Sequence, residues 1–483
     1  MSFHFVDQSD INNKKERKLI RSHVMKGKNI GKKRLKKTQH SESTTNKSVI
    51  LHGAGVGNES TSTTTLERLQ CDDASILAVT RQIANDLSLL PSTREISPQT
   101  MFHIRQMSSY ILDISCPREF CQSTGVTEWI WFQLTFYNKA YFHCTVAIAS
   151  ACAAFLTGDS YHSPVALCHM SEAYRLVNKT LSSSEPLSDT TVAVVAAINI
   201  YDRLYGDPQK AMVHLNGLAG LITLRGGISE LAERNIVIAE KAFRSDIELA
   251  LSCGTTPKFS SRHVPRRLIL TDSRGCLEPR QNGEAEALKS ILYHSVSAGL
   301  RDVVLEILRF SHLLNQASRA RKLDSVAYQG TLLYVGYRLL EIKHPRYDSD
   351  ADTDFDTLVQ LALTGFQNTF CFGMGRKIMA FPLVMERFRS VAQTIRRDNR
   401  SQQMVIFWAL LVGRVSALTR DDDVWLILKL KALANELELQ SWPEVSNALR
   451  QFPWVNAMHE AQGEEFWNKK LAHAIPLEST LVE

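Results

Sequence analysis

Lysine and arginine side chains crowd one short stretch of this 483-residue chain. The segment KKERKLIRSHVMKGKNIGKKRLKK, from Lys14 to Lys37, contains only one acidic residue, Glu16. Clustered cations of this kind bind phosphate groups or act as a nuclear import signal. The candidate nucleic-acid or import residues are Lys14, Lys15, Arg17, Lys18, Arg21, Lys26, Lys28, Lys32, Lys33, Arg34, Lys36 and Lys37.

This basic stretch would bind nucleic acid through its charge, because phosphate contacts position a protein without reading its target sequence. If about six cations met phosphates, the logarithm of the affinity would fall with that of salt at a slope near −5. We expect the free segment to be disordered, and a helix over Asp10 to Met25 that forms on DNA is an open alternative. A membrane surface is the disfavoured partner, because bulky apolar anchors are sparse.

Other motifs suggest chemistry that their surroundings do not support. VILHGAGVGN (49–58) lacks the third glycine of a dinucleotide-binding fingerprint, and no amphipathic helix follows to bind a pyrophosphate. HEAQG (459–463) lacks the second histidine of a zinc protease. Cys116 and Cys121 have no second pair of cysteines to complete a zinc site. We therefore expect no enzyme activity, no metal and no cofactor.

The positive charge belongs to the N-terminal stretch rather than to the whole chain. The chain has 56 basic and 50 acidic residues, net +6, whereas residues 1–37 alone hold twelve bases and three acids, net +9. The remaining residues therefore hold 44 bases and 47 acids, net −3. This asymmetry indicates a basic arm on a neutral-to-acidic body, and the 44% hydrophobic content suffices for a large core.

Cysteine usage and hydropathy indicate an intracellular protein. The nine cysteines are scattered, and those in apolar helical runs, such as Cys144 and Cys152, are expected to pack as small hydrophobes. No secretory signal is evident. The longest apolar stretches, 144–156 and 192–200, fall short of the roughly 18 residues of a membrane span.

The chain divides into three predicted regions. Residues 1–40 form the arm, and residues 41–66, with eleven Ser or Thr, form a disordered linker. From residue 67 to 483, apolar residues recur at helical spacing and strand signals are rare, so we expect a large, irregular, all-α domain. Residues 253–285, rich in turn formers, predict a long surface loop within it.

The clearest helix follows the sequence GDP at 206–208. Asp207 is a good N-cap, Pro208 suits the first helical position, and Gly226 and Gly227 predict the stop. Its expected buried face is Ala211, Leu215, Leu218 and Ile222. Gly217 and Gly220 inside this helix predict close approach of a neighbouring helix.

Three further helices have sequence signals at their ends or along their length. Residues 192–200 are apolar on nearly every side, which predicts a central helix capped by Ser188 or Asp189. Three acids at 421–423 suit a helix N-terminus, and SWPE (441–444) has capping-box spacing.

The order of motifs resembles the helical regulatory domain of fungal-specific transcription factors. WIWFQLTFYNKAYFHCTVAIASA (129–151) is similar to an early aromatic helix of the family, 188–227 to its most recognisable core, and FPWVNAMHEAQGEEFW (452–467) to its C-terminal end. The start FHFVDQSD with the basic run resembles the leader of a subgroup. The matching residues are Asp189, Gly206, Asp207, His214, Gly217, Leu218, Arg225, Gly226, Gly227, Trp454 and Trp467.

One family feature is missing from the sequence. The binuclear zinc cluster that usually precedes this domain reads DNA bases, but no cysteine here precedes Cys71 and later ones lack paired spacing. The resemblance therefore supplies no metal ligand and no base-reading module. It implies a nuclear transcription regulator whose arm contacts import receptors or DNA. The helical body is expected to bind protein partners, to form a homo- or heterodimer, or to bind an effector. The alternative is an interaction scaffold that keeps the fold and does not bind DNA.

Overall fold

A computed structural model describes most of the chain beyond residue 101. The described residues are 102, 104–108, 115–122, 134–135, 137–157, 163–183, 187–270, 288–317, 322–342, 351–371, 381–416 and 422–472. The chain divides into Met1–Asp86 and Leu87–Glu483, and every described residue belongs to the second unit. The arm (1–40), the linker (41–66) and the expected start of the helical region at Glu67 lie outside the described residues.

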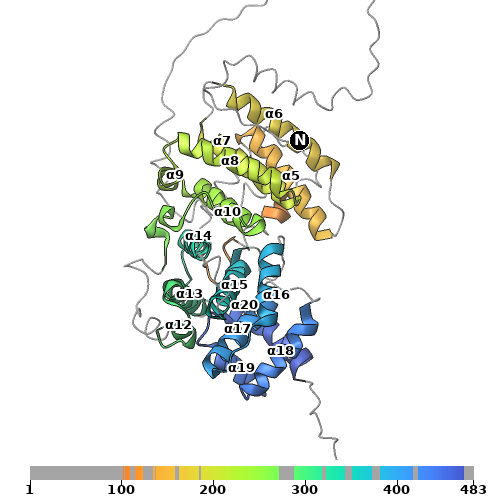
Figure 1. The fold of residues 1–483 in the computed structure, drawn as a ribbon. Helices are drawn as coiled ribbons and strands as arrows, with labels where there is room; N and C mark the ends of the chain where they lie inside the picture. The colour runs from red at the N-terminus through yellow and green to blue at the C-terminus, as the bar shows by residue number, and fades with distance from the viewer. Residues whose placement is uncertain are drawn as a thin grey trace, which may run out of the picture. The chain divides into compact units, whose positions relative to one another are not determined.

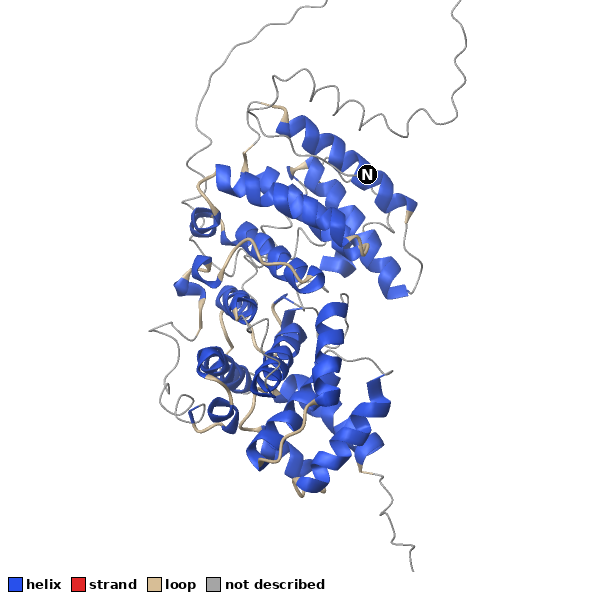
Figure 2. Ribbon diagram, in the orientation of Figure 1, coloured by secondary structure: helices blue, strands red, loops and turns tan. Residues whose placement is uncertain are grey.

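Helices and the loops between them make up the described part of the chain (Figures 1 and 2). The first group is α5 (Lys139–Thr157), α6 (Pro164–Leu181), α7 (Asp189–Leu204), α8 (Pro208–Leu224), α9 (Ile228–Arg234) and α10 (Ile236–Cys253), followed by the short 3₁₀ turns η4 (Ser261–His263) and η5 (Arg266–Leu268). The second group is α12 (Ile291–Ser295), α13 (Ala298–Ala317), α14 (Ser325–Glu341), α15 (Ala351–Cys371), α16 (Pro382–Thr394), α17 (Arg400–Ser416), α18 (Asp423–Glu436), α19 (Trp442–Leu449), α20 (Asn456–Phe466) and the π-helical η7 (Trp467–Leu471).

The all-α prediction is confirmed. Among the described residues, β pairing is limited to an isolated bridge between Cys121 and Leu323. None of the described helices has the length and apolar character needed to cross a bilayer.

Two apolar clusters form the core. The first is built mainly by α5 to α10, and the second by α12 to α20. Helix α14 contributes to both, because Leu333 and Tyr337 pack in the first cluster and Leu332 and Val335 in the second. Helix α10 contacts α7, α8, α9, α14 and α16, so α10 and α14 together join the two clusters.

The predicted central helix is α7. The Ser188 side chain accepts a hydrogen bond from the Thr191 backbone N–H at 3.1 Å, which caps the helix. Residues 191–199 are all buried, as their nearly continuous apolar sequence predicts. Cys144 and Cys152 of the adjacent α5 are also buried, as expected for small hydrophobes.

Helix α8 has the predicted start and the predicted buried face. The Asp207 carboxylate accepts a hydrogen bond from the Lys210 backbone N–H at 3.0 Å, and Pro208 occupies the first turn. The face consisting of Ala211, Leu215, Leu218 and Ile222 is at most 1% exposed. The sequence periodicity therefore identified the side of α8 that packs on the core.

The expectation of close helix packing is wrong at Gly220. A Cβ added there would meet no atom within 4 Å, because Gly220 lies on the exposed side of α8. Close approach occurs instead at Gly330 of α14, where a Cβ would lie 2.5 Å from the Leu268 Cβ and 2.6 Å from its carbonyl oxygen.

The prediction of a surface loop over 253–285 is correct in part: Cys253 ends α10, residues 254–270 are irregular backbone with two short 3₁₀ turns, and residues 271–285 lie outside the described residues. Val264, Leu268, Ile269 and Leu270 are buried. The Asp246 carboxylate of α10 accepts backbone hydrogen bonds from residues 258 and 259, both at 2.8 Å, and so fixes the path of the segment.

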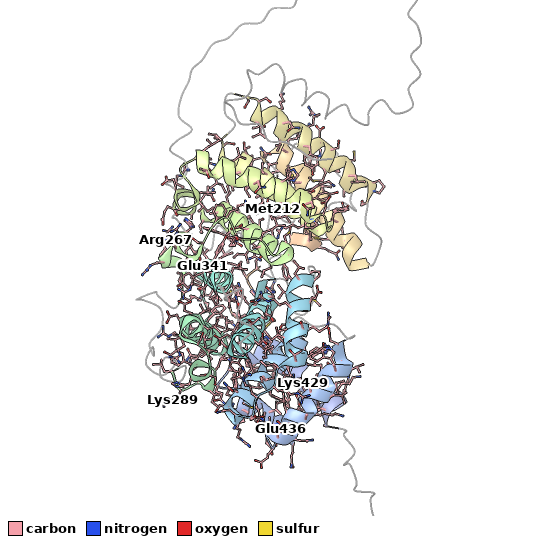
Figure 3. The ribbon with its side chains drawn as sticks, in the orientation of Figure 1. Met212, Arg267, Lys289, Glu341, Lys429 and Glu436 are labelled. Carbon is pink, nitrogen blue, oxygen red and sulfur yellow. The ribbon has the colours of Figure 1, made fainter. Side chains whose placement is uncertain are left out.

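The same segment is fixed on its outer side as well. Glu341 of α14 accepts hydrogen bonds from the Ser261 backbone N–H and hydroxyl, both at 2.8 Å, and Arg267 pairs with Glu233 of α9. Figure 3 labels Glu341 and Arg267. Contacts with distant helices therefore give this turn-rich sequence its structure.

Near the C-terminus, the predicted acidic start and capping box are present. Asp422 is the N-cap of α18 and pairs with Arg389 at 2.5 Å. Glu444 accepts the Ser441 backbone N–H at 3.1 Å, completing the capping box of α19. Both signals are local in sequence, so both helix starts were predictable.

Candidate functional site: a buried polar junction of α7, α8, α10 and α14

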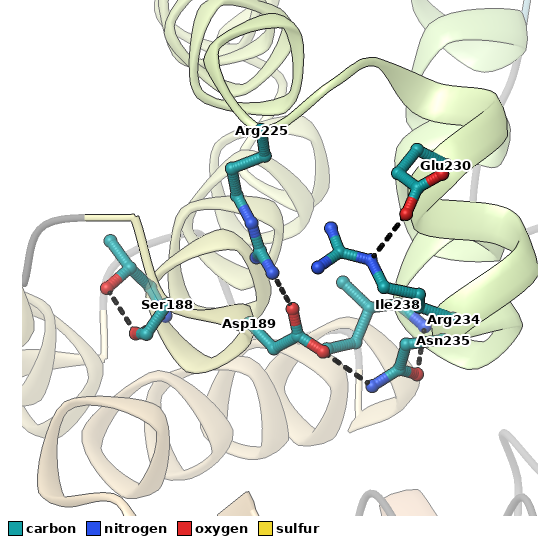
Figure 4. A network of polar contacts seen from close by, with 8 residues as sticks. Ser188, Asp189, Arg225, Glu230, Arg234, Asn235 and Ile238 are labelled. Carbon is teal, nitrogen blue, oxygen red and sulfur yellow. Dashed lines mark hydrogen bonds and ion pairs between the residues drawn. The ribbon is translucent and has the colours of Figure 1, made fainter.

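Asp189 joins three helices at one point (Figure 4). It stands in the first turn of α7 and accepts hydrogen bonds from the Arg225 guanidinium and, at 3.1 Å, from the Asn235 amide. Arg225 is the C-cap of α8, and Asn235 is the N-cap of α10, where its side-chain oxygen accepts from the Ile238 backbone N–H at 3.4 Å. The Asp189 carboxylate thus connects the start of α7, the end of α8 and the start of α10.

Gly206 and the Gly226–Gly227 pair form the turns that this arrangement needs. Both turns have the two backbone hydrogen bonds of a Schellman motif, which ends a helix. At the end of α7, the Gly206 N–H donates to the Arg203 carbonyl and the next backbone N–H donates to the carbonyl of residue 202, both at 3.0 Å. In α8, Gly227 N–H donates to Ile222 O at 2.9 Å. Gly206 has φ +68° and Gly226 φ +96°, conformations that favour glycine.

His214 of α8 contacts Asp202 of α7 in a buried pair. Its Nδ1 lies 2.5 Å from the Asp202 carboxylate, and the Tyr174 hydroxyl donates to the same carboxylate at 3.4 Å. Burial and then Asp202 raise the pKa of Tyr174, so the phenol stays protonated. Burial and Asp202 likewise raise the pKa of the nearby Cys144 thiol, which is unfavourable for a nucleophile. The group therefore suits helix packing rather than nucleophilic catalysis.

Helix α10 carries a cluster of buried charged side chains. Glu248 pairs with Arg203 of α7, and both side chains are at most 5% exposed. About two turns nearer the start of α10, the Glu240 carboxylate lies 3.1 Å from the Arg244 guanidinium and 3.8 Å from the Lys241 ammonium. Burial, followed by the neighbouring Arg244, lowers the pKa of Arg203. We call these five residues the α10 charge cluster.

The α10 charge cluster extends to α14 through Gln329. Arg244 donates to the Gln329 side-chain oxygen, and the Gln329 amide donates to the Ser115 carbonyl. Gln329 is itself buried. Polar contacts therefore join α7 to α10 through Arg203 and Glu248, and join α10 to α14 and the segment at 115–122 through Arg244 and Gln329.

The α10 charge cluster was not predictable from the sequence. The charged residues at 240, 241, 244 and 248 look like an exposed face when α10 is considered alone. Glu240 and Glu248 are buried, and Lys241 and Arg244 are half-buried, because other helices cover α10 on several sides. The only sequence signal was the apolar content of both flanking stretches, 236–239 and 249–251, which marks a central helix.

The two predicted tryptophans lie apart from this junction. Trp454 and Trp467 belong to the second apolar cluster, whereas Leu218 belongs to the first. The Trp454 indole N–H donates to Glu460 at 2.9 Å, and a Cβ at Gly463 would lie 3.1 Å from the Trp454 ring. These residues pack α20 and do not contribute to the polar junction.

The remaining family-motif residues have structural positions in α8, and the basic residues are not placed. Gly217 lies inside α8, half-buried, and Leu218 is on its buried face. The candidate nucleic-acid or import residues between Lys14 and Lys37 all lie outside the described residues. Within the described part of the chain, no group of three or more His, Cys, Asp or Glu side chains could hold a metal ion.

Comparison with known families identifies the region that contains this junction. Residues 125–268 match the family model of the fungal specific transcription factor domain. This stretch is similar to the fungal specific transcription factor domain. It includes α5 to α10, and with them Asp189, His214 and Arg225, so the predicted resemblance is confirmed here. The searches of curated proteins and of solved structures gave no match.

The matched domain ends close to the helices of the second cluster. Its last matched residue, Leu268, packs against Gly330 of α14. The resemblance of 452–467 to the C-terminal end of the family lies outside the matched residues and stays a prediction. The domain match supports a role in transcription regulation.

Proposed function

We propose that this chain is a nuclear transcription regulator whose helical domain binds protein partners and whose arm, Lys14 to Lys37, binds import receptors or nucleic acid. The match of residues 125–268 to the fungal specific transcription factor domain carries the proposal. The +9 charge of residues 1–37, against −3 for the rest, supports the role of the arm. The helical unit would act without an enzymatic reaction, a metal or a cofactor.

Localisation of a fluorescent fusion tests the import role. Replacing the twelve basic residues of the arm by Gln should move the protein from nucleus to cytosol, because import receptors bind clustered Lys and Arg. Deletion of residues 41–64 is a control of equal length that removes only one basic residue, Lys47. Equal nuclear signal for the intact and Gln-substituted arms would contradict the import role.

Gel-shift titration tests nucleic-acid binding. The full chain should retard DNA fragments of unrelated sequence at low salt, and the Gln-substituted arm should not. A log–log salt slope near −5 would correspond to about six phosphate contacts. Loss of all retardation at about 50 mM salt would favour the alternative, an interaction scaffold that does not bind DNA.

Partner binding by the helical unit is a separate part of the proposal. A homodimer or heterodimer is the expected form, because the described helices carry the matched regulatory domain but the sequence shows no base-reading module. Light scattering of the purified full chain over a concentration series measures self-association. Copurification from cells with and without the arm distinguishes partners held by the helices from those held by charge.

A further inference from the structure

A small cavity lies where the matched region, residues 125–268, meets α14. Its walls come from α10, from α14 and from the segment around Val264 and Leu268, and the contact of Leu268 with Gly330 closes one wall. The volume of the cavity is about 40 Å³. One buried water needs about 10–15 Å³ of such space, so about three or four non-hydrogen atoms fit. The cavity therefore suits a very small molecule.

Apolar side chains cover most of the cavity wall. Val237 and Phe243 of α10 and Val326 and Leu333 of α14 are among them. Ligand sites in proteins have this composition, in which apolar walls bind the body of a molecule and a few polar groups orient it. Removal of apolar surface from water favours an alkyl group at these walls.

Most polar groups at the edge of the cavity are already satisfied. Lys241 and Arg244 both pair with Glu240, and each has further contacts. The Gln329 side-chain oxygen accepts from Arg244, and its amide donates to the Ser115 carbonyl. These groups therefore do not require a charged ligand.

The Glu240 carboxylate has one oxygen that can accept another hydrogen bond. Arg244 Nη2 at 3.1 Å and Lys241 Nζ at 3.8 Å both contact Oε1, and no hydrogen bond or ion pair among the described residues reaches Oε2. Oε2 retains accessible surface, because it is not one of the enclosed polar atoms that lack a partner. Glu240 is only 7% exposed and borders the cavity, so this surface faces the cavity. A carboxylate oxygen accepts from any suitably placed donor.

From this geometry we propose that the cavity binds a short-chain aliphatic alcohol, whose hydroxyl donates to Glu240 Oε2 and whose alkyl group contacts the apolar walls. A carboxylate ligand would bring no donor and would face the like charge of Glu240. An ammonium ligand would lose its hydration beside two cations, Lys241 and Arg244. The site goes beyond the proposed function, because binding here requires neither the arm nor nucleic acid.

Occupancy would couple the two apolar clusters. The alcohol would contact residues of α10 and of α14, such as Val237 and Leu333, at the same time. A ligand that binds only the folded protein stabilises it by mass action. Because α10 belongs to the matched region and α14 does not, the alcohol would strengthen the junction between them.

A methyl NMR titration of the full chain, labelled at Ile, Leu and Val methyl groups, tests the proposal. The probes are 2-propanol, acetone, acetate and isopropylammonium, which have the same number of non-hydrogen atoms. We expect 2-propanol to give saturable shifts at the methyl groups that line the cavity. Acetone should bind at least about tenfold more weakly because it has no donor for the carboxylate, and both ions should also bind at least about tenfold more weakly. Absence of saturable shifts with 2-propanol, or equal or tighter binding of any other probe, would overturn the proposal.

Two substitutions locate the site. Glu240→Gln replaces the carboxylate by an amide that can also donate, so the preference for 2-propanol over acetone should largely disappear. Val326→Phe should fill the cavity and abolish the shift of the Leu333 methyl groups. The matched controls, Glu464→Gln in α20 and Val424→Phe in α18, change exposed residues and should alter neither result. An unchanged preference in Glu240→Gln with native circular dichroism would refute the role of its carboxylate. Unchanged 2-propanol affinity in Val326→Phe would refute the site even if Glu240→Gln did not fold.

Discussion

Acid should destabilise this protein through a buried histidine at its C-terminal end. His459 of α20 is 0% exposed. Its Nδ1 accepts a hydrogen bond from the Val455 backbone N–H at 3.0 Å, and Nε2 lies 3.5 Å from the Thr369 hydroxyl. The rings of Phe366 and Trp454 lie 5.4 and 5.1 Å from the imidazole, between centroids. Nδ1 must be unprotonated to accept from Val455, so the packing selects the neutral imidazole.

The size of the effect follows from the pKa of His459. Burial lowers this pKa from 6.5 to about 3, although the hydrogen bond from Val455 opposes the shift. The unfolded chain therefore binds a proton near pH 6.5, while the folded chain does not until about pH 3. Stability is complete above the unfolded pKa and falls as pH decreases. At about pH 5 the loss from this group is about 2 kcal/mol, from about 1.4 kcal/mol per pKa unit.

Urea unfolding at neutral and acid pH measures this loss. The variant His459→Asn removes the titrating group, and its side-chain oxygen can replace Nδ1 as acceptor for Val455. The variant will be less stable at neutral pH because it loses ring packing. The difference in free energy of unfolding between the unsubstituted protein and this variant should shrink by about 2 kcal/mol at about pH 5. The control is His294→Asn, since His294 is exposed. A deficit for His459→Asn that stays constant with pH would refute the reasoning.

Substitutions at glycines and at the Asp189 junction test the packing. Gly220→Ala should stabilise by about 0.5–1 kcal/mol in a thermal melt, because an exposed helix interior gains from Ala. Gly330→Ala should destabilise by about 1–3 kcal/mol, since its Cβ would collide with Leu268, and a stabilised variant would contradict the packing. Asp189→Ala and Arg225→Ala should be non-additive, with a coupling of about 0.5–1 kcal/mol in a double-mutant cycle, because they share one ion pair. Additive losses would show that the pair does not connect α7 and α8.

Local signals made the helix ends predictable. The capping group of α8 is Asp207, which bonds to a backbone N–H only three residues later. The stop at Gly226 depends on bonds within the same turn. Such interactions span a few residues, so the sequence contains all the atoms that make them. The same holds for the capping box at Ser441.

Features that depend on distant contacts were not predictable. Residues 254–270 have the composition of a loop, but Asp246 and Glu341 bind their backbone from two other helices. Likewise, the turn-forming residues did not indicate that Leu268 would pack directly against Gly330. Each case joins residues that are far apart along the chain, and one sequence without its fold does not show which of them meet.

The α10 charge cluster has a physical consequence for the junction of α10 and α14. Buried ion pairs often contribute little net stability relative to an apolar core, because desolvation offsets their attraction. Removing one partner is strongly unfavourable, since it leaves an unmatched charge. Sliding α10 along α14 would separate Arg244 from Gln329, whereas the pair of Arg244 with Glu240 lies within α10 and would move as a unit. The contact of Arg244 with Gln329 therefore favours one register of the two helices, and in this register a cavity forms beside Lys241.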